Sequence, residues 1–254
     1  MKTQKMMTLV QVELKKLYRD PMTLAVLLLM PVGLTVVYYL ALSGVTNDYY
    51  PVPGMNHFEY LLPGTMGYAV IYMGMLVSLA LCEYRESGLL KRIETTPASP
   101  HEYLGSLIIA YMTIAVVQAW IVLLVARLLG YEPLGGLVGL LLASLFLALL
   151  GVTAVGLGLL TATIAKSAGA ASGLATIFIV PMMMFGTLLA VFNDATRTIA
   201  KFTPNYYVSD SLSVIFHEGS VSDAVIWQNL LILSIICLVI VVGGIQLFKK
   251  TEYR

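Results

Sequence analysis

The sequence has few charged side chains for its length. Of 254 residues only 11% are Asp, Glu, Lys or Arg, whereas 59% are hydrophobic. A soluble domain carries about 25% charged residues, so this chain lacks the charge that would cover a water-facing surface. The apolar residues also come in long unbroken runs instead of at strand or helix spacing. This pattern predicts an integral membrane protein.

Several kinds of chemical site are missing from the sequence. Its two cysteines, Cys82 and Cys237, lie in or beside apolar runs and form no metal-binding or redox motif. The Ser/His pairs, paired aspartates and zinc motifs of intramembrane hydrolysis are absent from the runs, and the chain has no phosphate-binding loop. The net charge of +1 gives no reason to expect a nucleic-acid partner. We therefore expect neither an enzyme nor a chain that itself binds ATP, a metal or another cofactor.

Ionisable residues are also missing from the middle of the apolar runs. Transporters driven by a proton or ion gradient usually place such a residue there, whereas Glu83 and Lys166 lie at the ends of runs. The three histidines, His57, His101 and His217, fall between the runs. We expect them to be solvated loop histidines.

Six apolar runs are long enough to cross a bilayer, which takes ~20 residues. They lie near residues 22–43, 60–82, 104–126, 134–165, 168–192 and 225–248. The fourth run is longer than one crossing needs, so it must tilt, bend at Gly151 or Gly156, or begin outside the hydrocarbon. The sequence thus predicts an all-α integral membrane fold with six transmembrane helices in a single domain, residues 1–254.

The positions of the basic residues predict the orientation, because positively charged loops stay in the cytoplasm. If the N-terminus is inside, the outer segments hold only Arg127, Arg197 and Lys201, which leaves 12 of the 15 basic residues inside. We therefore expect both termini in the cytoplasm and the protein in the cell (plasma) membrane.

Residues 3–19, before the first run, have the pattern of an amphipathic helix. A helix lying in the inner membrane interface and stopped at Asp20-Pro21 fits this pattern. The alternative is an ordinary positive flank that only fixes topology. The apolar arc contains Met6, Met7, Val10, Leu14, Leu17 and Tyr18, and the basic side contains Lys5, Lys15, Lys16 and Arg19.

Residues 84–98 form a charged segment between the second and third runs. Its middle can form a short helix that ends at Pro97, with Leu89, Leu90 and Ile93 on one face. That shape suits docking into the groove of a partner protein. A charged loop that only sets topology is the alternative.

This segment resembles the first cytoplasmic loop of the permeases of type-2 ATP-binding-cassette exporters, which include bacterial drug and lipid exporters. The family loop reads Glu-Arg/Lys-Glu-x-Gly-Thr-Leu-x-Arg-Leu-x-x-Thr-Pro. Here Leu89 replaces the common threonine and Tyr84 the common acid. The residues that match are Glu86, Gly88, Leu90, Arg92, Thr96 and Pro97.

The resemblance implies a partner ATPase subunit, which would hold ATP and Mg²⁺, and a second permease copy in a homodimer. It also implies short helices that re-enter the outer leaflet within residues 194–224. The residues expected to couple the permease to the ATPase are Glu86, Gly88, Leu89, Leu90, Arg92, Ile93, Thr96 and Pro97.

Methionines and aromatic residues cluster in the second and fifth runs, which line the substrate pathway in the family that the chain resembles. Such side chains suit a lipophilic substrate, whether a drug, a lipid or a peptide. Lipid-facing or packing side chains are the alternative. The predicted pathway residues are Tyr68, Tyr72, Met73, Phe178, Met182, Met183 and Phe185.

Gly169 and Gly173 give the start of the fifth run a face of small residues that lets helices approach closely. This face predicts either the dimer contact or packing against the fourth run of the same chain.

We therefore predict a permease that moves a lipophilic substrate outward with energy from ATP hydrolysed by a separate subunit. The alternatives are a channel or gradient-driven carrier, and a membrane enzyme or non-transporting assembly factor.

Overall fold

A computed structural model describes residues 2–46, 54–89, 100–185 and 194–252 of the protein. Within these ranges the chain is helical, apart from turns, connections and one isolated antiparallel bridge between Thr46 and Asn56. The helices are α1 Lys2–Arg19, α2 Pro21–Leu42, α3 His57–Glu86, α5 Pro100–Leu128, α6 Gly136–Ile164, α7 Ala168–Met183, α8 Asp194–Ala200, α9 Pro204–Ser213, the π-helix η2 Val214–Glu218, and α10 Ala224–Glu252. The all-α prediction is therefore confirmed.

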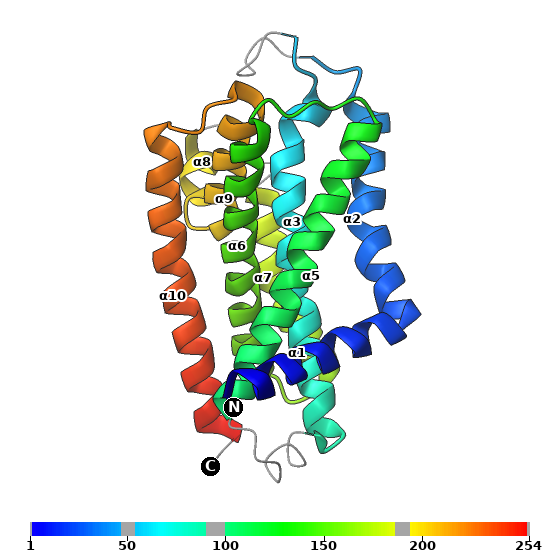
Figure 1. Ribbon diagram of the computed structural model, residues 1–254, viewed down its shortest axis with the longest axis vertical. Helices are drawn as coiled ribbons and strands as arrows, with labels where there is room; N and C mark the ends of the chain where they lie inside the picture. Colours follow the sequence, from blue (N-terminus) through cyan, green and yellow to red (C-terminus); the bar gives the residue numbers. More distant parts are fainter. Residues whose placement is uncertain (1, 47–53, 90–99, 186–193, 253–254) are drawn as a thin grey trace.

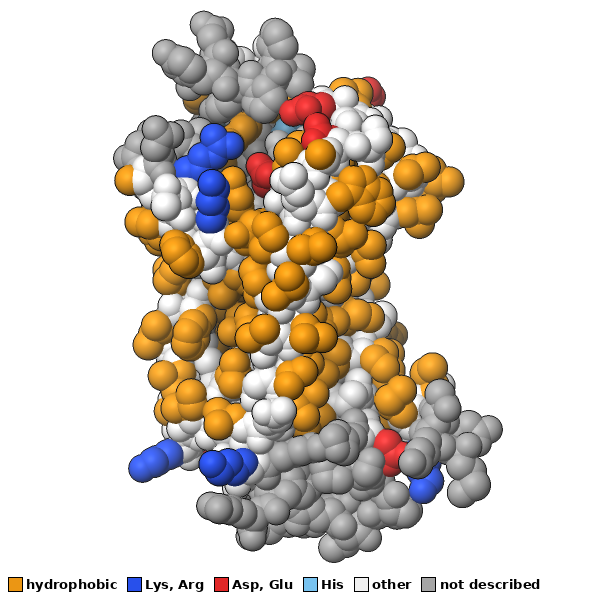
Figure 2. All heavy atoms as spheres, turned by 90° about the vertical axis from the view of Figure 1, so that its left-hand side faces the viewer, with side chains coloured by type: hydrophobic (Ala, Val, Ile, Leu, Met, Phe, Trp, Pro, Cys, Tyr) orange, Lys and Arg blue, Asp and Glu red, His pale blue; other side chains and the backbone are white. Residues whose placement is uncertain are grey.

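The long helices run side by side along the length of the molecule, and α1 lies across one end of the bundle (Figure 1). The N- and C-termini lie at that same end. Among the described residues, five helices are long and apolar enough to cross a membrane, namely α2, α3, α5, α6 and α10. Figure 2 shows a broad middle band of hydrophobic side chains, with charged side chains gathered toward the two ends. This distribution is that of an integral membrane protein.

The fifth predicted span, residues 168–192, corresponds to α7, which has 16 residues. A helix of this length rises about 24 Å, less than the ~30 Å of a hydrocarbon core. Residues 186–193, which complete the predicted span, lie outside the described residues. The count of six therefore stays a prediction.

The longest predicted run forms one unbroken helix, α6, of 29 residues. Its glycines serve close helix packing. A Cβ at Gly151 would lie 3.4 Å from the Cα of Met112 in α5, and one at Gly156 would lie 2.9 Å from the side chain of Ile240 in α10. Whether the extra length of α6 is taken up by tilt, a bend or residues outside the hydrocarbon stays a prediction.

Helix α3 is the centre of the bundle. It begins with a capping box, in which Asn56 Oδ1 accepts a hydrogen bond from the Glu59 N–H at 2.9 Å and Glu59 Oε2 accepts one from the Asn56 N–H at 3.1 Å. In its most apolar stretch 72% of the residues are buried. Gly74 lets α6 approach so closely that a Cβ there would lie 2.6 Å from the carbonyl oxygen of Ala154.

Helix α2 is attached to the bundle more sparsely, with 17% of its most apolar stretch buried. Pro31 lies inside this helix and has no N–H, so the carbonyl of Leu27, four residues earlier, lacks its usual donor. Gln118 of α5 donates a hydrogen bond from Nε2 to this oxygen. Both residues are 1% exposed. One side chain therefore satisfies the backbone group that the proline leaves open.

Helix α1 packs along one face and leaves the other open, and its location in the membrane interface stays a prediction. Val10 and Leu17 of the predicted apolar arc are buried, whereas Met7 and Tyr18 are 55% and 80% exposed. The helix ends before Asp20, whose Oδ1 accepts a hydrogen bond from the Thr23 N–H at 3.1 Å to cap α2. The apolar arc is thus divided between the bundle and the open side.

The short helices α8, α9 and η2 lie at the end of the bundle opposite α1 (Figure 1). They bury Val208, Leu212, Ile215 and Phe216 against the bundle and leave Phe202 85% exposed. The predicted short helices in residues 194–224 are present. Their depth in the outer leaflet stays a prediction.

Candidate coupling site and substrate pathway

The predicted coupling segment begins where α3 ends. The Ser87 N–H donates to the Glu83 carbonyl at 2.9 Å, and the Gly88 N–H donates to the Arg85 carbonyl at 3.1 Å. Gly88 has a φ of +72°, a left-handed conformation that other residues rarely adopt. Gly88 therefore ends the helix. Leu89 is half-buried, and the predicted coupling residues Leu90, Arg92, Ile93, Thr96 and Pro97 lie outside the described residues.

Glu86 contacts another part of its own chain. Its Oε1 accepts a hydrogen bond from the backbone N–H of Ala168, in the first turn of α7, at 3.0 Å. Ser167 caps the same helix by accepting a bond from the Ala170 N–H at 3.3 Å. The first N–H groups of a helix have no partner inside it. Glu86 therefore helps to cap α7.

Arg85, the residue before Glu86, binds the end of α6, on the other side of the turn between α6 and α7. Its Nη1 donates to the carbonyl of Ala165 at 2.9 Å and its Nη2 donates to the carbonyl of Ala162 at 3.0 Å, both at the C-terminal end of α6. Sequence reasoning did not select Arg85. The available signal was its position between Tyr84 and Glu86, at the end of an apolar run.

Further polar contacts join the C-terminal half of α3 to α6 and α7. Ser78 Oγ lies 2.8 Å from Thr161 Oγ1 of α6 and 3.5 Å from the carbonyl oxygen of Ala171 in α7. Cys82 Sγ lies 3.7 Å from the carbonyl oxygen of Ala162. Because residues 78, 82 and 85 share one helical face, these contacts form a stripe that leads to the coupling segment.

Helix α1 contacts α3 through charged and aromatic groups. The Tyr84 hydroxyl donates to Glu13 Oε2 at 3.1 Å, and the Lys16 ammonium lies 3.6 Å from the centre of the Tyr84 ring. Burial raises the pKa of the Glu13 carboxyl, and the Lys16 charge and the Tyr84 hydrogen bond oppose this rise. Burial also lowers the pKa of the Lys16 ammonium. Sequence analysis did not identify Glu13, which is only 5% exposed.

The predicted pathway residues of α3 do not share one surface. The Tyr68 hydroxyl lies 3.9 Å from the sulfur of Met30 in α2, and the Tyr68 ring centre lies 6.4 Å from that of Tyr72. Tyr68 thus faces α2. Met73 is fully buried inside the bundle.

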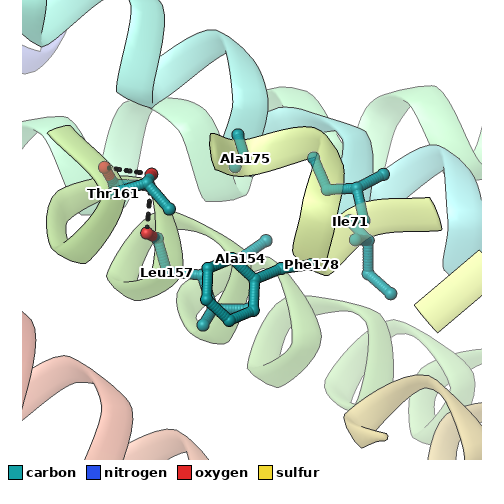
Figure 3. A pocket seen from close by; sticks show the side chains of 9 residues that line it. Ile71, Ala154, Leu157, Thr161, Ala175 and Phe178 are labelled. Atoms are coloured by element: carbon teal, nitrogen blue, oxygen red, sulfur yellow. Dashed lines mark hydrogen bonds between the residues drawn. The ribbon is translucent and has the colours of Figure 1, made fainter. Parts of the chain in front are cut away.

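On α7 and just after its end, the predicted pathway residues are also divided. Met182 is 9% exposed, Met183 and Phe185 are half-buried, and Phe178 is 44% exposed. Figure 3 shows Phe178 of α7 beside Ala154 of α6, on a pocket that Ile71 of α3 also lines. The pocket has a volume of about 10 Å³, enough for one water molecule at most. This pocket within a single chain is therefore too small for a substrate.

Gly169 and Gly173 lie on an exposed face of α7. Among the described residues, nothing lies within 4 Å of a Cβ added at either position. The opposite face of α7 is buried through Ala171, Ala175 and Ile179. These glycines therefore do not pack against α6 of the same chain. Their role in a dimer contact stays a prediction.

At the opposite end, two buried polar residues hold the short helices in place. Asn205 of α9 donates from Nδ2 to the carbonyl of Met182 at 3.4 Å and packs directly on Gly67 of α3, where a Cβ would collide with it. His217 of η2 donates from Nε2 to the Glu59 carbonyl at 3.1 Å, which assigns the proton to this nitrogen.

The prediction of a solvated loop histidine is wrong for His217, which is 4% exposed. Its Nδ1 accepts a hydrogen bond from the Ser213 hydroxyl at 3.0 Å. Burial lowers the pKa of His217 to about 4, so the ring is neutral near pH 7. Sequence reasoning missed this because the segment reads as a connection between apolar runs.

A bundle of long apolar helices, crossed at one end by an amphipathic helix, defines a polytopic α-helical membrane protein. A family model described as ABC-2 type transporter matches residues 4–217. The chain therefore belongs to the ABC-2 type transporter family, and it is a permease subunit of this kind of transporter. Such a permease is not itself catalytic and pairs with separate subunits that hydrolyse ATP. No curated protein matches the chain.

Proposed function

We propose that this chain is the permease of an exporter that moves a lipophilic substrate outward across the plasma membrane. The main support for the proposal is the position of α3 in the bundle. This helix is buried along most of its length in the centre of the bundle, and it leads directly into the segment that resembles the ATPase-coupling loop of the family. Force applied to that segment by an ATPase would act on the core of the membrane domain.

The proposed topology has six spans, with α7 and the residues that follow it as the fifth. Both termini are cytoplasmic, in keeping with the predominance of basic residues on that side. The ends of α1 and α10 lie at one end of the bundle, as this topology requires.

The proposed active form contains two copies of the chain that meet along α7. The open face of this helix joins Gly169 and Gly173 to Ile177 and Val180, which are 64% and 43% exposed. Small residues let two helices come close, and the apolar side chains then fill the contact. A pathway between two copies would also explain why the pocket beside Phe178 is so small.

The coupling part of the proposal is tested by substituting Leu90, on the predicted apolar docking face. Leu90→Asp should abolish co-purification of the ATPase, because a charge would have to enter an apolar contact. Leu90→Pro should leave the ATPase partly bound but stop transport, because a proline in a helix interior costs about 3 kcal/mol and breaks the helix. Ser99→Asp, outside the predicted face, is the matched control.

Transport itself is measured in vesicles that contain the permease and its ATPase subunit. ATP-dependent movement of a lipophilic fluorescent dye supports the proposal. A permease that purifies without any ATPase and conducts ions alone would instead support the channel alternative. Normal transport and ATPase binding in both Leu90 variants would show that the segment only sets topology.

The dimer contact is tested with cysteines introduced on α7 in a chain that lacks Cys82 and Cys237. A cysteine at Ile177 should cross-link two copies, whereas one at Ala175, which is buried inside the bundle, should not. Equal cross-linking at both positions would contradict a specific contact along the open face.

A further inference from the structure

Two helix ends meet at the turn between α6 and α7, and adjacent residues of α3 bind both. The last carbonyls of α6 lack donors within the helix, and the first N–H groups of α7 lack acceptors. The helix dipole makes the C-terminal end of α6 partly negative and the N-terminal end of α7 partly positive. Arg85 supplies a cation to the carbonyls of Ala162 and Ala165, and Glu86 supplies an anion to the Ala168 N–H.

We propose that Arg85 and Glu86 act as a transmission clamp between the ATPase-coupling segment and α7. When the segment moves, the clamp carries the inner ends of α6 and α7 with α3. This inference rests on the proposed function. It makes both side chains positioning residues, because they contact backbone groups of their own chain and no substrate.

The location of the clamp favours this role. Gly88, whose left-handed conformation ends α3, follows Glu86 after one residue, so the coupling segment leaves the helix beside the clamp. Any displacement of the segment is therefore applied next to the bonds that hold the turn. The two bonds of Arg85, at 2.9 and 3.0 Å, form a fork that resists rotation better than a single bond.

Transmission to α7 would have consequences for the substrate. α7 carries Phe178, Met182 and Met183 of the predicted pathway, and its open face is the proposed dimer contact. Near its outer end, the carbonyl of Met182 is bound by Asn205 of α9. A force at the inner end would thus act on a helix that is held at the other end, and would change the contact between two copies.

The clamp also alters the role predicted for Glu86. The sequence resemblance assigns this residue to ATPase coupling, and a surface carboxylate would do this by contacting the ATPase. In the structure its Oε1 binds α7 instead. Loss of a docking contact and loss of the clamp give different results, because the first releases the ATPase and the second leaves it bound.

The experiment uses the permease–ATPase complex in lipid vesicles and measures ATP hydrolysis and dye transport on the same sample. We expect Arg85→Ala and Glu86→Ala to keep the ATPase bound and to hydrolyse ATP within about twofold of the unmodified complex. Transport should fall by about tenfold, because the charge-assisted bonds that would carry the movement to α6 and α7 are removed. Glu83→Gln, an exposed acid one turn earlier on α3, is the matched control and should transport normally.

Two further variants distinguish a clamp from a simple ion pair. Arg85→Lys keeps the charge but not the fork, and should transport at an intermediate rate. The double exchange Arg85→Glu with Glu86→Arg should not restore transport, because the polarity of the two helix ends is fixed. Recovery of transport in the double exchange would overturn the proposal.

A spectroscopic measurement follows the movement itself. A spin label on a cysteine at Lys166, an exposed residue in the α6–α7 turn, should change mobility when ATP is trapped on the complex. We expect this change to disappear in Arg85→Ala while hydrolysis continues. An unaltered change in that variant, or loss of the ATPase from it, would refute the clamp. Absence of ATP-dependent transport in the unmodified complex would instead refute the proposed function.

Discussion

The hydrogen bond between Gln118 and the Leu27 carbonyl allows a prediction about stability. The effect of Gln118→Leu on the free energy of unfolding should depend on whether residue 31 is proline or alanine. Pro31 is the reason that this carbonyl needs an outside donor. In the unmodified chain Gln118→Leu removes the donor and leaves a backbone oxygen buried without a partner. That costs about 1 to 3 kcal/mol in proteins generally, while bonds between membrane helices average about 0.6 kcal/mol and reach about 1.7.

A second term partly offsets this cost. Among the described residues Gln118 Oε1 has no partner although it is buried, so its removal recovers some desolvation energy. We therefore expect Gln118→Leu to lower the free energy of unfolding by about 1 kcal/mol.

In a Pro31→Ala background the same substitution should be neutral or stabilising. The introduced alanine would supply the N–H that closes the normal helical bond to Leu27, and the amide of Gln118 would then have no acceptor. The coupling energy between the two substitutions should be about 1 to 2 kcal/mol, well above the ~0.5 kcal/mol expected for independent sites. The cycle subtracts the gain in helix propensity and the loss of ring packing, because both occur in each Pro31→Ala variant.

The measurement is equilibrium unfolding of the four proteins by SDS in mixed micelles. Pro181→Ala serves as control, since that proline lies in α7 and should show no coupling to Gln118. Equal destabilisation by Gln118→Leu in both Pro31 backgrounds would refute the reasoning that the proline creates the need for this glutamine.

Two other predictions concern packing and pH. Gly74→Ala should destabilise the protein by about 1 to 3 kcal/mol, because its Cβ would lie 2.6 Å from the carbonyl oxygen of Ala154. Gly33→Ala, with nothing within 4 Å, should be neutral or slightly stabilising in the same unfolding assay. Equal effects at both glycines would show that α3 and α6 are not in close contact. Burial raises the pKa of Glu13 above 4.5, so its contribution to stability is greatest below pH 4.5 and is lost as pH rises through the raised value. Glu13→Gln, which keeps an acceptor for the Tyr84 hydroxyl, should remove that part of the pH dependence. If Glu13→Gln and the unmodified protein show the same dependence of thermal unfolding on pH between 4 and 7, the pKa of Glu13 is not raised by burial.

The sequence by itself determined the class of fold and much of its organisation. Runs of apolar residues that a bilayer requires located five of the spans, and Asp20-Pro21 predicted the boundary between α1 and α2. The motif around Glu86 and Gly88 predicted a coupling segment after the second run. These features depend on local composition or on residues within a few positions of each other, so the chain order alone reveals them.

The tertiary structure decided which polar groups meet. Arg85 finds its acceptors about 80 positions later in the chain, and Gln118 finds its acceptor about 90 positions earlier. Such partners are set by how helices cross, and no periodicity in the sequence predicts them. In a membrane protein a buried backbone group without a partner costs several kcal/mol, so these distant contacts are strongly constrained once the helices pack. The sequence selected Glu86 for coupling, and only the packed structure connects it to α7.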